Sequence, residues 1–472
     1  MRAAIALVAA CLALAALTLL APSSPSYDPF AWIVWGRELM PGAGGEPFGL
    51  AGGPSWKPLP VLFTAPFSLA GDAAPELWLL VARTGLLLAL AGAFALGRRL
   101  DGALAGAIAA LFVLLLSDVV SLAWRGASEP LLLAAVLWAV ERHLAGARRT
   151  AFALGVAAAL IRPEAAPFVA LYAVWLWRHE DARGRALLLG GLALLPLLWI
   201  GLPGLAGDPF AASATAQVDI GDQPSAGTAL SRGYELPVGP VWLLVLVALF
   251  VREREPAQYV LAGGALAWFG LVAAMTAAGY SGVARYMLPA AAVVAVLAGV
   301  GAMDLLRLLA RRRTLAFSAL AAAVFVICVG PIAERAATLD DQVREGTAVA
   351  RAHDDLRAAV AGSGGAAATR RCALAGWVAV NHTTGSALAW ELRVSLDRVA
   401  RTMSRPGLLV RAPRSTATGG PPAVTLDAPV RSATVAHAGP WDVLAVRAGG
   451  TPFPRACEPR KASGSPRRIP NI

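Results

Sequence analysis

The sequence predicts an α-helical polytopic membrane protein with about eleven transmembrane helices, followed by a small extracytoplasmic α/β domain. Three observations lead to this class. Hydrophobic residues make up 57% of the 472-residue chain and charged residues only 15%, whereas a soluble protein carries roughly a quarter charged residues. Apolar runs that suit a bilayer recur as far as residue 332. Beyond that point the sequence becomes polar.

Arginine clusters separate the apolar runs and set the predicted topology. The net charge of +11 would suit a nucleic-acid partner, but the arginines sit in short groups between apolar runs, where they orient helices. The basic groups are Arg98/Arg99, Arg142/Arg148/Arg149, Arg178/Arg183/Arg185, Arg252/Arg254 and Arg307/Arg311/Arg312/Arg313. By the positive-inside rule these loops are cytoplasmic, which places the N-terminus inside and everything after Ile332 outside. Abundant Ala, Gly and Arg beside two lysines favour a bacterial source, and hence a bacterial plasma membrane.

The apolar runs define the elements in order. They cover residues 3–21, 77–97, 103–118, 127–140, 150–161, 165–177, 186–202, 238–251, 257–278, 286–306 and 314–332. The first resembles a signal peptide, but its apolar core is long, so we favour an uncleaved helix. The runs 150–161 and 165–177 are short: twelve helical residues reach about 18 Å, against about 30 Å of hydrocarbon. We therefore expect a helical hairpin that holds Arg162 and Glu164 below the outer surface in a protein-lined or wet recess.

The polar C-terminal portion predicts a helix from Ala333 to about Val360 and then several strands. The strand-like pieces are Cys372–Val380, Leu388–Val394, Leu408–Val410, Ala423–Leu426 and Val443–Val446. We therefore divide the chain into a membrane domain (1–332), an outer α/β domain (333–457) and a disordered tail (458–472). An outer location would allow a disulfide between Cys372 and Cys457, although spacing alone does not establish one.

Asp28 is the first candidate for chemistry. It lies near the start of a long outward loop, 26–66, that is rich in Gly, Pro and aromatic residues. Asp28-Pro29 is also typical of a helix N-cap followed by proline, here for a helix over Phe30–Met40. The alternative is a carboxylate at the lipid boundary that acts as general base on a hydroxyl.

Candidate cations occur at the predicted outer face. Lys57 lies in Trp56-Lys57-Pro58-Leu59-Pro60, where it either snorkels to the interface or binds a lipid-linked phosphate. Four arginines also lie at the predicted extracytoplasmic ends of the apolar runs, although the positive-inside rule disfavours cations there. They are Arg125, Arg162, Arg285 and, less clearly, Arg83. Each alone could contact a lipid headgroup, but several together would form a phosphate or pyrophosphate site.

Three further acids face outward. Asp118 could pair with Asp28 as a second carboxylate or a metal ligand. For Glu129 and Glu164 a structural role is favoured, as a helix cap and as the counter-ion of Arg162. The five histidines have no ligand spacing, so the sequence predicts no zinc site. Walker, dinucleotide-binding and G-x-S-x-G motifs do not occur in the sequence, which argues against nucleotide-driven and serine-hydrolase chemistry.

These motifs resemble those of the GT-C superfamily of integral-membrane glycosyltransferases, including polyprenyl-phosphate-sugar mannosyl-, arabinosyl- and aminoarabinosyl-transferases. The resemblance is in the order of the motifs along the chain and in the membrane side on which each is predicted to lie. The resemblance covers about the first 330 residues. It rests on Tyr27-Asp28-Pro29-Phe30, Trp56-Lys57-Pro58-Leu59-Pro60, Ser128-Glu129-Pro130-Leu131, Arg162-Pro163-Glu164 and Arg285-Tyr286-Met287-Leu288-Pro289.

The resemblance implies an inverting transfer of a sugar from a polyprenyl-phosphate donor to a cell-envelope acceptor on the outer side. Asp28 would be the base, Lys57, Arg125, Arg162 and Arg285 would hold the leaving phosphate, and Tyr286 would support them. Many relatives carry paired acids in the first loop, whereas Asp28 has no adjacent acid; a divalent cation is therefore an open question, and no other cofactor is implied. The outer domain resembles appendages that several members carry.

Two other functions fit the same sequence. A transporter or flippase of lipid-linked saccharide would use the arginines without needing Asp28 as a base. A non-catalytic envelope assembly protein would use its outer domain to bind a partner.

Overall fold

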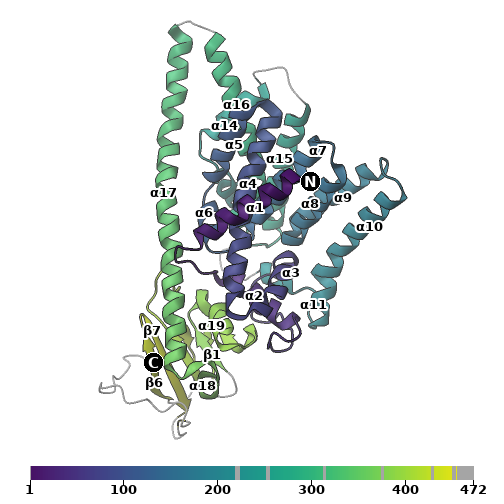
Figure 1. Ribbon diagram of the computed structural model, residues 1–472. Helices are drawn as coiled ribbons and strands as arrows, with labels where there is room; N and C mark the ends of the chain where they lie inside the picture. The colour runs from purple at the N-terminus through teal and green to yellow at the C-terminus, as the bar shows by residue number, and fades with distance from the viewer. Residues whose placement is uncertain are drawn as a thin grey trace.

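The protein is a bundle of helices with a mixed β-sheet at one end (Figure 1), as seen in a computed structural model that describes residues 2–217, 224–250, 256–311, 315–373, 377–426, 430–448 and 453. The helices of the bundle are α1 (Arg2–Thr18), α2 (Tyr27–Leu39), α3 (Pro58–Phe67), α4 (Ala74–Asp101), α5 (Ala103–Leu114), α6 (Val119–Trp124), α7 (Glu129–Leu144), α8 (Arg148–Ile161), α9 (Ala166–Trp177), α10 (Ala182–Pro196), α11 (Leu202–Leu205), α12 (Ala211–Ala216), α13 (Ala226–Tyr234), α14 (Val241–Phe250), α15 (Pro256–Ala277) and α16 (Leu288–Arg311).

Several of these helices have the length and composition of membrane spans. Within the described ranges, four stretches are long and apolar enough to cross a bilayer: Pro58–Asp101, Ala182–Leu205, Pro256–Ala277 and Ala284–Leu308. Shorter apolar helices lie beside them, among them α5 and α14. The predicted membrane character is thus confirmed, while the count of about eleven spans and the orientation stay predictions.

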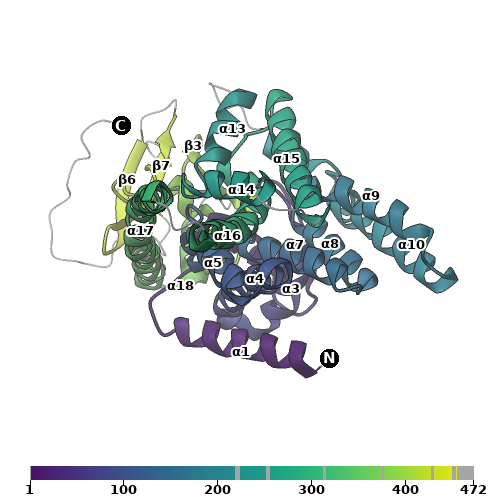
Figure 2. The same cartoon turned by 90° about the horizontal axis from the view of Figure 1, so that it is seen from above.

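The predicted hairpin is present. Helix α8 ends at Ile161, a 3-10 turn covers Pro163–Ala165, and α9 begins at Ala166. Pro163 has no amide hydrogen to continue α8, which favours a break at this position. Arg162 and Glu164 are both buried at the turn. Helices α9 and α10 project away from the body on the side opposite α17 (Figure 2).

The longest helix joins the two ends of the molecule. Helix α17 (Leu315–Gly362) contains 48 residues and runs from the bundle down to the sheet (Figure 1). The apolar run 314–332 and the polar helix expected after Ala333 are therefore one continuous helix. The predicted domain boundary at 332/333 lies inside it, and the division into domains stays a prediction.

One end of the molecule, which we call the sheet end, holds a five-stranded sheet in the order β2-β1-β4-β7-β6, in which β1 is parallel to β2 and β4, while β7 is antiparallel to β4 and β6. A parallel pair, β3 and β5, lies beside it. The strands are β1 (Val378–Val380), β2 (Val399–Ala400), β3 (Thr402–Met403), β4 (Gly407–Arg411), β5 (Ala423–Val424), β6 (Val430–Ala438) and β7 (Trp441–Ala448). Helices α18 (Gly365–Cys372) and α19 (Gly385–Leu392) complete this end.

Some predictions for this region were wrong. The expected strand Leu388–Val394 is mostly helix α19, because a short apolar run such as Leu388-Ala389-Trp390 does not distinguish strand from helix. Strand β6 was not predicted, since it is an edge strand with many exposed positions and no clear apolar alternation. Cys372 is disulfide-bonded; Cys457 and the tail 458–472 lie outside the described residues, so the predicted pairing and disorder stay predictions.

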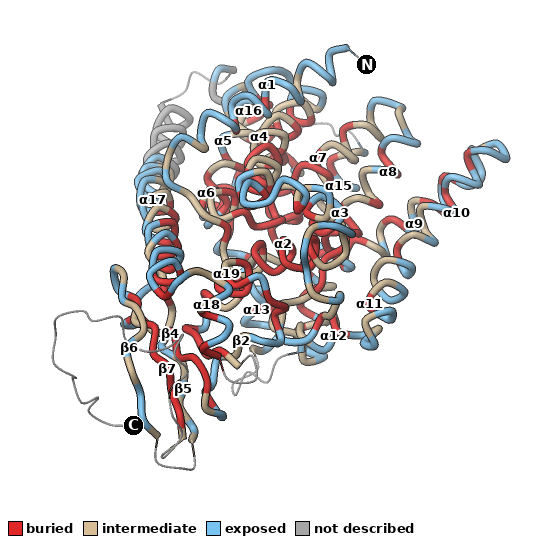
Figure 3. The backbone as a smooth tube through the Cα atoms, turned by 60° about the horizontal axis from the view of Figure 1, so that its bottom comes forward, coloured by how far each residue is buried: buried red, intermediate tan, exposed pale blue. Residues whose placement is uncertain are grey.

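Helix α2 and the sheet end share one hydrophobic core. Trp32 and Trp35 of α2 belong to the same buried cluster as Leu388 of α19 and Trp441 of β7. The buried segments of α2 and α19 lie next to each other in Figure 3. Arg37 is buried at this contact and donates to the carbonyl oxygens of Trp390 (3.2 Å) and Val394 (3.0 Å). Helix α2, which carries Asp28, is thus held between the rest of the bundle and the sheet.

Candidate active site

Asp28 lies in the first turn of α2 and faces an arginine from a distant helix. The N-cap position belongs to Ser26, which makes no side-chain capping bond, so the interpretation of Asp28 as the N-cap is wrong. Instead, Asp28 Oδ2 accepts a hydrogen bond from Arg285 Nη2 at 3.1 Å. Arg285 belongs to the 3-10 turn Ala284–Met287 that leads into α16. The two side chains are 21% and 34% exposed, so both remain accessible from outside the protein.

A fully buried carboxylate, Glu129, gathers three of the predicted cations. It occupies the first turn of α7. Its Oε1 atom lies 2.8 Å from Arg162 Nη2, 3.4 Å from Lys57 Nζ and 3.8 Å from Arg285 Nε. Lys57 also donates to Ser128 Oγ at 2.8 Å. We call Glu129 with Lys57, Arg162 and Arg285 the Glu129 cluster.

Neighbouring groups fix the orientation of these cations. Arg162 Nη1 lies 3.4 Å from Glu164 Oε1, and its guanidinium carbon lies 3.8 Å from the centroid of the Tyr286 ring. The ammonium of Lys57 lies 5.0 Å from the centroid of a Trp32 ring. Both are cation–π contacts. Taking Asp28 and Glu164 with the Glu129 cluster, three carboxylates face three cations and the formal charges balance.

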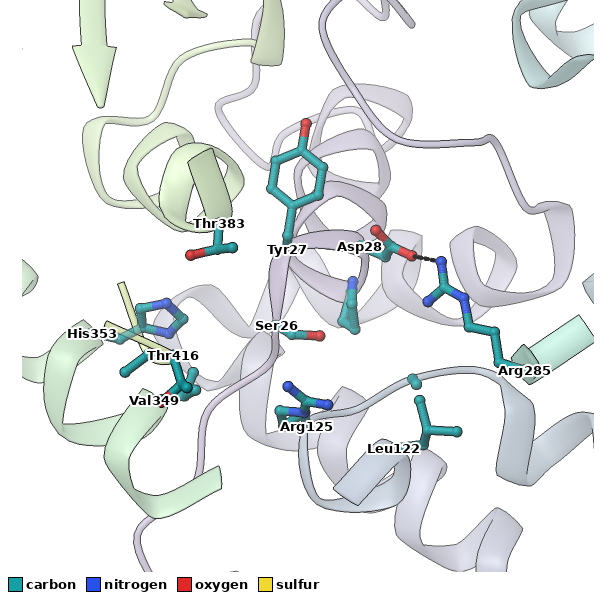
Figure 4. Close-up of a pocket in the computed structure, with 13 residues that line it drawn as sticks. Ser26, Tyr27, Asp28, Leu122, Arg125, Arg285, Val349, His353, Thr383 and Thr416 are labelled. Carbon is teal, nitrogen blue, oxygen red and sulfur yellow. Dashed lines mark hydrogen bonds and ion pairs between the residues drawn. The ribbon is translucent and has the colours of Figure 1, made fainter. Parts of the chain in front are cut away.

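A pocket of about 190 Å³ opens beside Asp28. Residues from the bundle and from the sheet end line it together: Ser26, Tyr27, Asp28, Arg125, Arg285, His353, Thr383 and Thr416. Figure 4 shows Asp28 and Arg285 pointing toward each other on one side, with His353, Thr383 and Thr416 on the other. The pocket is therefore a composite of segments that are far apart in the sequence.

Arg125 reaches this pocket from the segment between α6 and α7. Its carbonyl oxygen accepts a hydrogen bond from the Ser26 amide at 2.9 Å, which ties that segment to the start of α2. Its guanidinium lies 3.5 Å from Glu345 of α17 and is 28% exposed. Arg125 and Arg285 are thus the two predicted cations that line the pocket, while Lys57 and Arg162 lie behind it.

Two predicted candidates lie away from the pocket. Asp118 is exposed at the N-cap of α6 in a left-handed conformation (φ 61°), where its carboxylate contacts Ser117. The structure therefore does not bring Asp118 to Asp28. Arg83 is buried against α1, where it donates to Thr18 Oγ1 at 2.9 Å. In the part of the chain that the structure describes, no three His, Cys, Asp or Glu side chains form a metal-binding group.

His353 is a pocket residue that sequence reasoning missed. It lies in the C-terminal part of α17, and its Nδ1 atom is 2.7 Å from Ser24 Oγ. Burial lowers the pKa of His353 to about 4, so the imidazole is neutral near pH 7. No local motif marks His353, Thr383 or Thr416 in the sequence, because only the fold brings them to Asp28.

Comparison with known proteins identifies the fold. No protein-family model matches the chain, and no curated protein matches it in sequence. Among solved structures, ArnT from Cupriavidus metallidurans bound to undecaprenyl phosphate matches with a TM-score of 0.58 at 14% identity, covering 96% of this chain and 100% of that chain. The apo state of the same ArnT matches with a TM-score of 0.55 at 16% identity, covering 94% and 98%. The chain has the fold of ArnT. The resemblance to the GT-C superfamily is thereby confirmed at the level of the fold.

Proposed function

We propose that this protein transfers a sugar from a polyprenyl-phosphate donor to an acceptor at the outer face of a bacterial plasma membrane. The observation that carries this proposal is that one carboxylate, Asp28, and two arginines, Arg125 and Arg285, line a single pocket. The fold supports the donor class, because ArnT of the same fold was solved with undecaprenyl phosphate bound. Transfer needs a base next to a phosphate site, and this pocket offers both.

In the proposed reaction, Asp28 removes the proton of an acceptor hydroxyl. The hydroxyl oxygen forms a bond to the anomeric carbon of the donor sugar, and the bond from that carbon to the phosphate oxygen breaks. The electron pair leaves with the polyprenyl phosphate, whose charge Arg285 stabilises. A single displacement of this kind inverts the anomeric configuration.

Arg285 has a second role in this proposal, because it is bonded to Asp28 before substrate arrives. A guanidinium matches phosphate oxygens in a bidentate way. A donor phosphate that binds Arg285 competes with Asp28 for the same Nη2 atom, so donor binding frees the carboxylate to act as base. This competition predicts that the donor binds before the acceptor is activated.

The four predicted phosphate-binding cations divide into two kinds. Arg285 and Arg125 line the pocket and can contact a phosphate directly. The side chains of Lys57 and Arg162 are only 8% and 5% exposed, and both are paired with Glu129. We therefore propose that Lys57 and Arg162 are positioning residues, which hold Glu129 and through it Arg285, and which add positive potential behind the phosphate.

Transfer and translocation can be separated in proteoliposomes that contain the full-length protein and radiolabelled polyprenyl-phosphate sugars. The proposal predicts labelled acceptor with the wild type, and loss of transfer with retained donor binding for Asp28→Asn. Asp118→Asn is the matched control and should keep its activity, because Asp118 lies outside the pocket. Movement of label across the bilayer without transfer would establish the flippase instead, and Asp28→Asn should not affect it.

A further inference from the structure

A serine of the sheet end bonds to the backbone directly before Asp28. Ser386 lies in the first turn of α19, and its Oγ atom donates to the Tyr27 carbonyl oxygen at 2.5 Å. The Ser386 side chain is fully buried and does not line the pocket, so it cannot touch a substrate there. Any effect of Ser386 on the reaction must therefore pass through Tyr27.

This hydrogen bond acts on the peptide unit that joins Tyr27 to Asp28. The carbonyl group of Tyr27 and the nitrogen and Cα atoms of Asp28 lie close to one plane, because the peptide bond has partial double-bond character. Fixing the carbonyl oxygen therefore fixes the plane from which the Asp28 side chain extends. One residue earlier, the Ser26 amide donates to the Arg125 carbonyl oxygen at 2.9 Å. The start of α2 is thus held by the bundle at Ser26 and by the sheet end at Tyr27.

The side chain of Tyr27 is held by the same segment of the sheet end. Its ring stacks on the His382 ring, with the two centroids 6.4 Å apart, and the guanidinium carbon of Arg401 lies 5.4 Å from the Tyr27 centroid. Its hydroxyl donates to the Gly52 carbonyl oxygen at 3.2 Å. His382 begins the 3-10 turn that leads directly into α19. One continuous segment therefore contacts both the ring and the carbonyl group of Tyr27.

The opposite end of α2 is bonded to the same segment. Arg37, near the last turn of α2, donates to the carbonyl oxygens of Trp390 and Val394. The segment 382–394 thus bonds to α2 near both of its ends. A tilt of α2 away from α19 would break at least one of these contacts, so the sheet end restrains the helix that carries Asp28.

The Asp28 carboxylate depends on this restraint once the donor is bound. Among the described residues, Arg285 is the only hydrogen-bond partner of the Asp28 side chain, and Figure 4 shows the two side chains pointing toward each other. In the proposed reaction the donor phosphate takes Arg285. The side chain then loses its partner at the step in which it must meet the acceptor hydroxyl, and the position of the backbone decides where the carboxylate lies.

We propose that Ser386 is a positioning residue for the sugar transfer. From the sheet end, it fixes the peptide unit between Tyr27 and Asp28, and so it holds the carboxylate in place after Arg285 has bound the donor phosphate. The sheet end is then part of the catalytic unit. A misplacement of about 1 Å can cost about a hundredfold in rate, so the loss of this one hydrogen bond should slow the reaction without preventing folding. This inference rests on the proposed function.

The test compares Ser386→Ala with Ser363→Ala in the full-length protein in lipid nanodiscs. Both serines are buried and donate to a backbone carbonyl oxygen, but Ser363 bonds to Val360 of α17, at 2.8 Å, and to Thr369 of α18. Single-turnover rates are measured at saturating labelled undecaprenyl-phosphate sugar, with an octyl glycoside and octyl phosphate as acceptors. We expect Ser386→Ala to slow transfer about tenfold, with a donor Kd within about twofold of wild type because no phosphate contact changes. Ser363→Ala should keep the wild-type rate.

A double-mutant cycle shows whether Ser386 acts through Asp28. In the Asp28→Asn background, Ser386→Ala should change the residual rate by less than about twofold, because the base whose position it controls is already lost. Ser386→Cys keeps nearly the size of the side chain but is only a weak donor. It should show the same pattern of losses, and it replaces Ser386→Ala if that variant does not fold.

The outcomes separate this inference from the proposed function. A Ser386→Ala rate within about twofold of wild type, an equal loss of rate in Ser363→Ala, or an undiminished loss in the Asp28→Asn background would each overturn the positioning role while leaving sugar transfer intact. A wild-type protein that binds donor but transfers to neither acceptor, with any of the labelled donor sugars tried, would overturn the proposed function and this inference with it.

Discussion

Glu129→Gln tests the electrostatic centre of the site. The substitution keeps the shape of the side chain but removes the charge that Lys57, Arg162 and Arg285 share, at distances of 3.4, 2.8 and 3.8 Å from one oxygen atom. Asp28 and Glu164 would then be the two carboxylates that face three cations, so the set gains one uncompensated positive charge. Breaking a buried ion pair by removing one partner costs about 3–5 kcal/mol. Because Glu129 is fully buried and has three partners, we expect the upper part of that range.

The assay is reversible unfolding in mixed micelles at increasing SDS, from which the free energy of unfolding is obtained. Glu164→Gln is the matched control: Glu164 is also buried, but it contacts Arg162 at 3.4 Å, and Arg162 keeps Glu129 at 2.8 Å. We expect the control to lose less than half as much free energy as Glu129→Gln. Equal losses in the two variants, or a loss below about 1 kcal/mol for Glu129→Gln, would refute the central role of Glu129.

Three further predictions concern other parts of the account. Arg285→Gln should raise the donor KM by at least about tenfold, because a charge-assisted hydrogen bond to phosphate is lost; a donor titration in nanodiscs checks this, and an unchanged KM would remove Arg285 from the phosphate site. Burial lowers the pKa of Lys57 to about 8, so its ammonium is charged below that pH and loses its proton above it. The donor kcat/KM should therefore fall as the pH rises through 8, and Lys57→Arg, which stays charged, should shift or remove that fall. Arg37→Ala removes both hydrogen bonds to the carbonyl oxygens of Trp390 and Val394 and should cost about 3 kcal/mol in the same unfolding assay; wild-type stability would show that this contact does not hold α2 to the end of the molecule that carries the sheet.

From the sequence we could predict those parts of the site that depend on which side of the membrane each residue lies. The hairpin around Arg162 followed from two runs too short to span a bilayer and from the basic clusters that flank the pair, both predicted to be cytoplasmic. The convergence of Asp28, Arg125 and Arg285 followed from placing all three at one membrane face, and the structure brings them to one pocket.

Other features depend on tertiary contacts that no local pattern records. Ser128-Glu129-Pro130 has the composition of an ordinary helix start, so the role of Glu129 as a shared counter-ion emerges only when Lys57 and Arg285 are folded against it. Asp118 was predicted to lie at the same membrane face as Asp28, but its left-handed conformation at the N-cap of α6 leaves it exposed and away from the pocket. Thr383 and Thr416 of the pocket lining come from a region whose strand and helix pattern was only partly predictable.

The central claim is that Asp28 is the base of a sugar transfer, and a single-turnover measurement tests it most directly. Full-length protein saturated with labelled donor is mixed with acceptor, and the rate of product formation is compared for wild type, Asp28→Asn and the control Asp118→Asn. The account predicts that Asp28→Asn loses at least about a hundredfold in rate, the lower end of what a general base contributes. It should bind donor at least as tightly as wild type, because Arg285 is freed from its carboxylate partner. A rate for Asp28→Asn within about threefold of wild type, well below that contribution, would contradict the account.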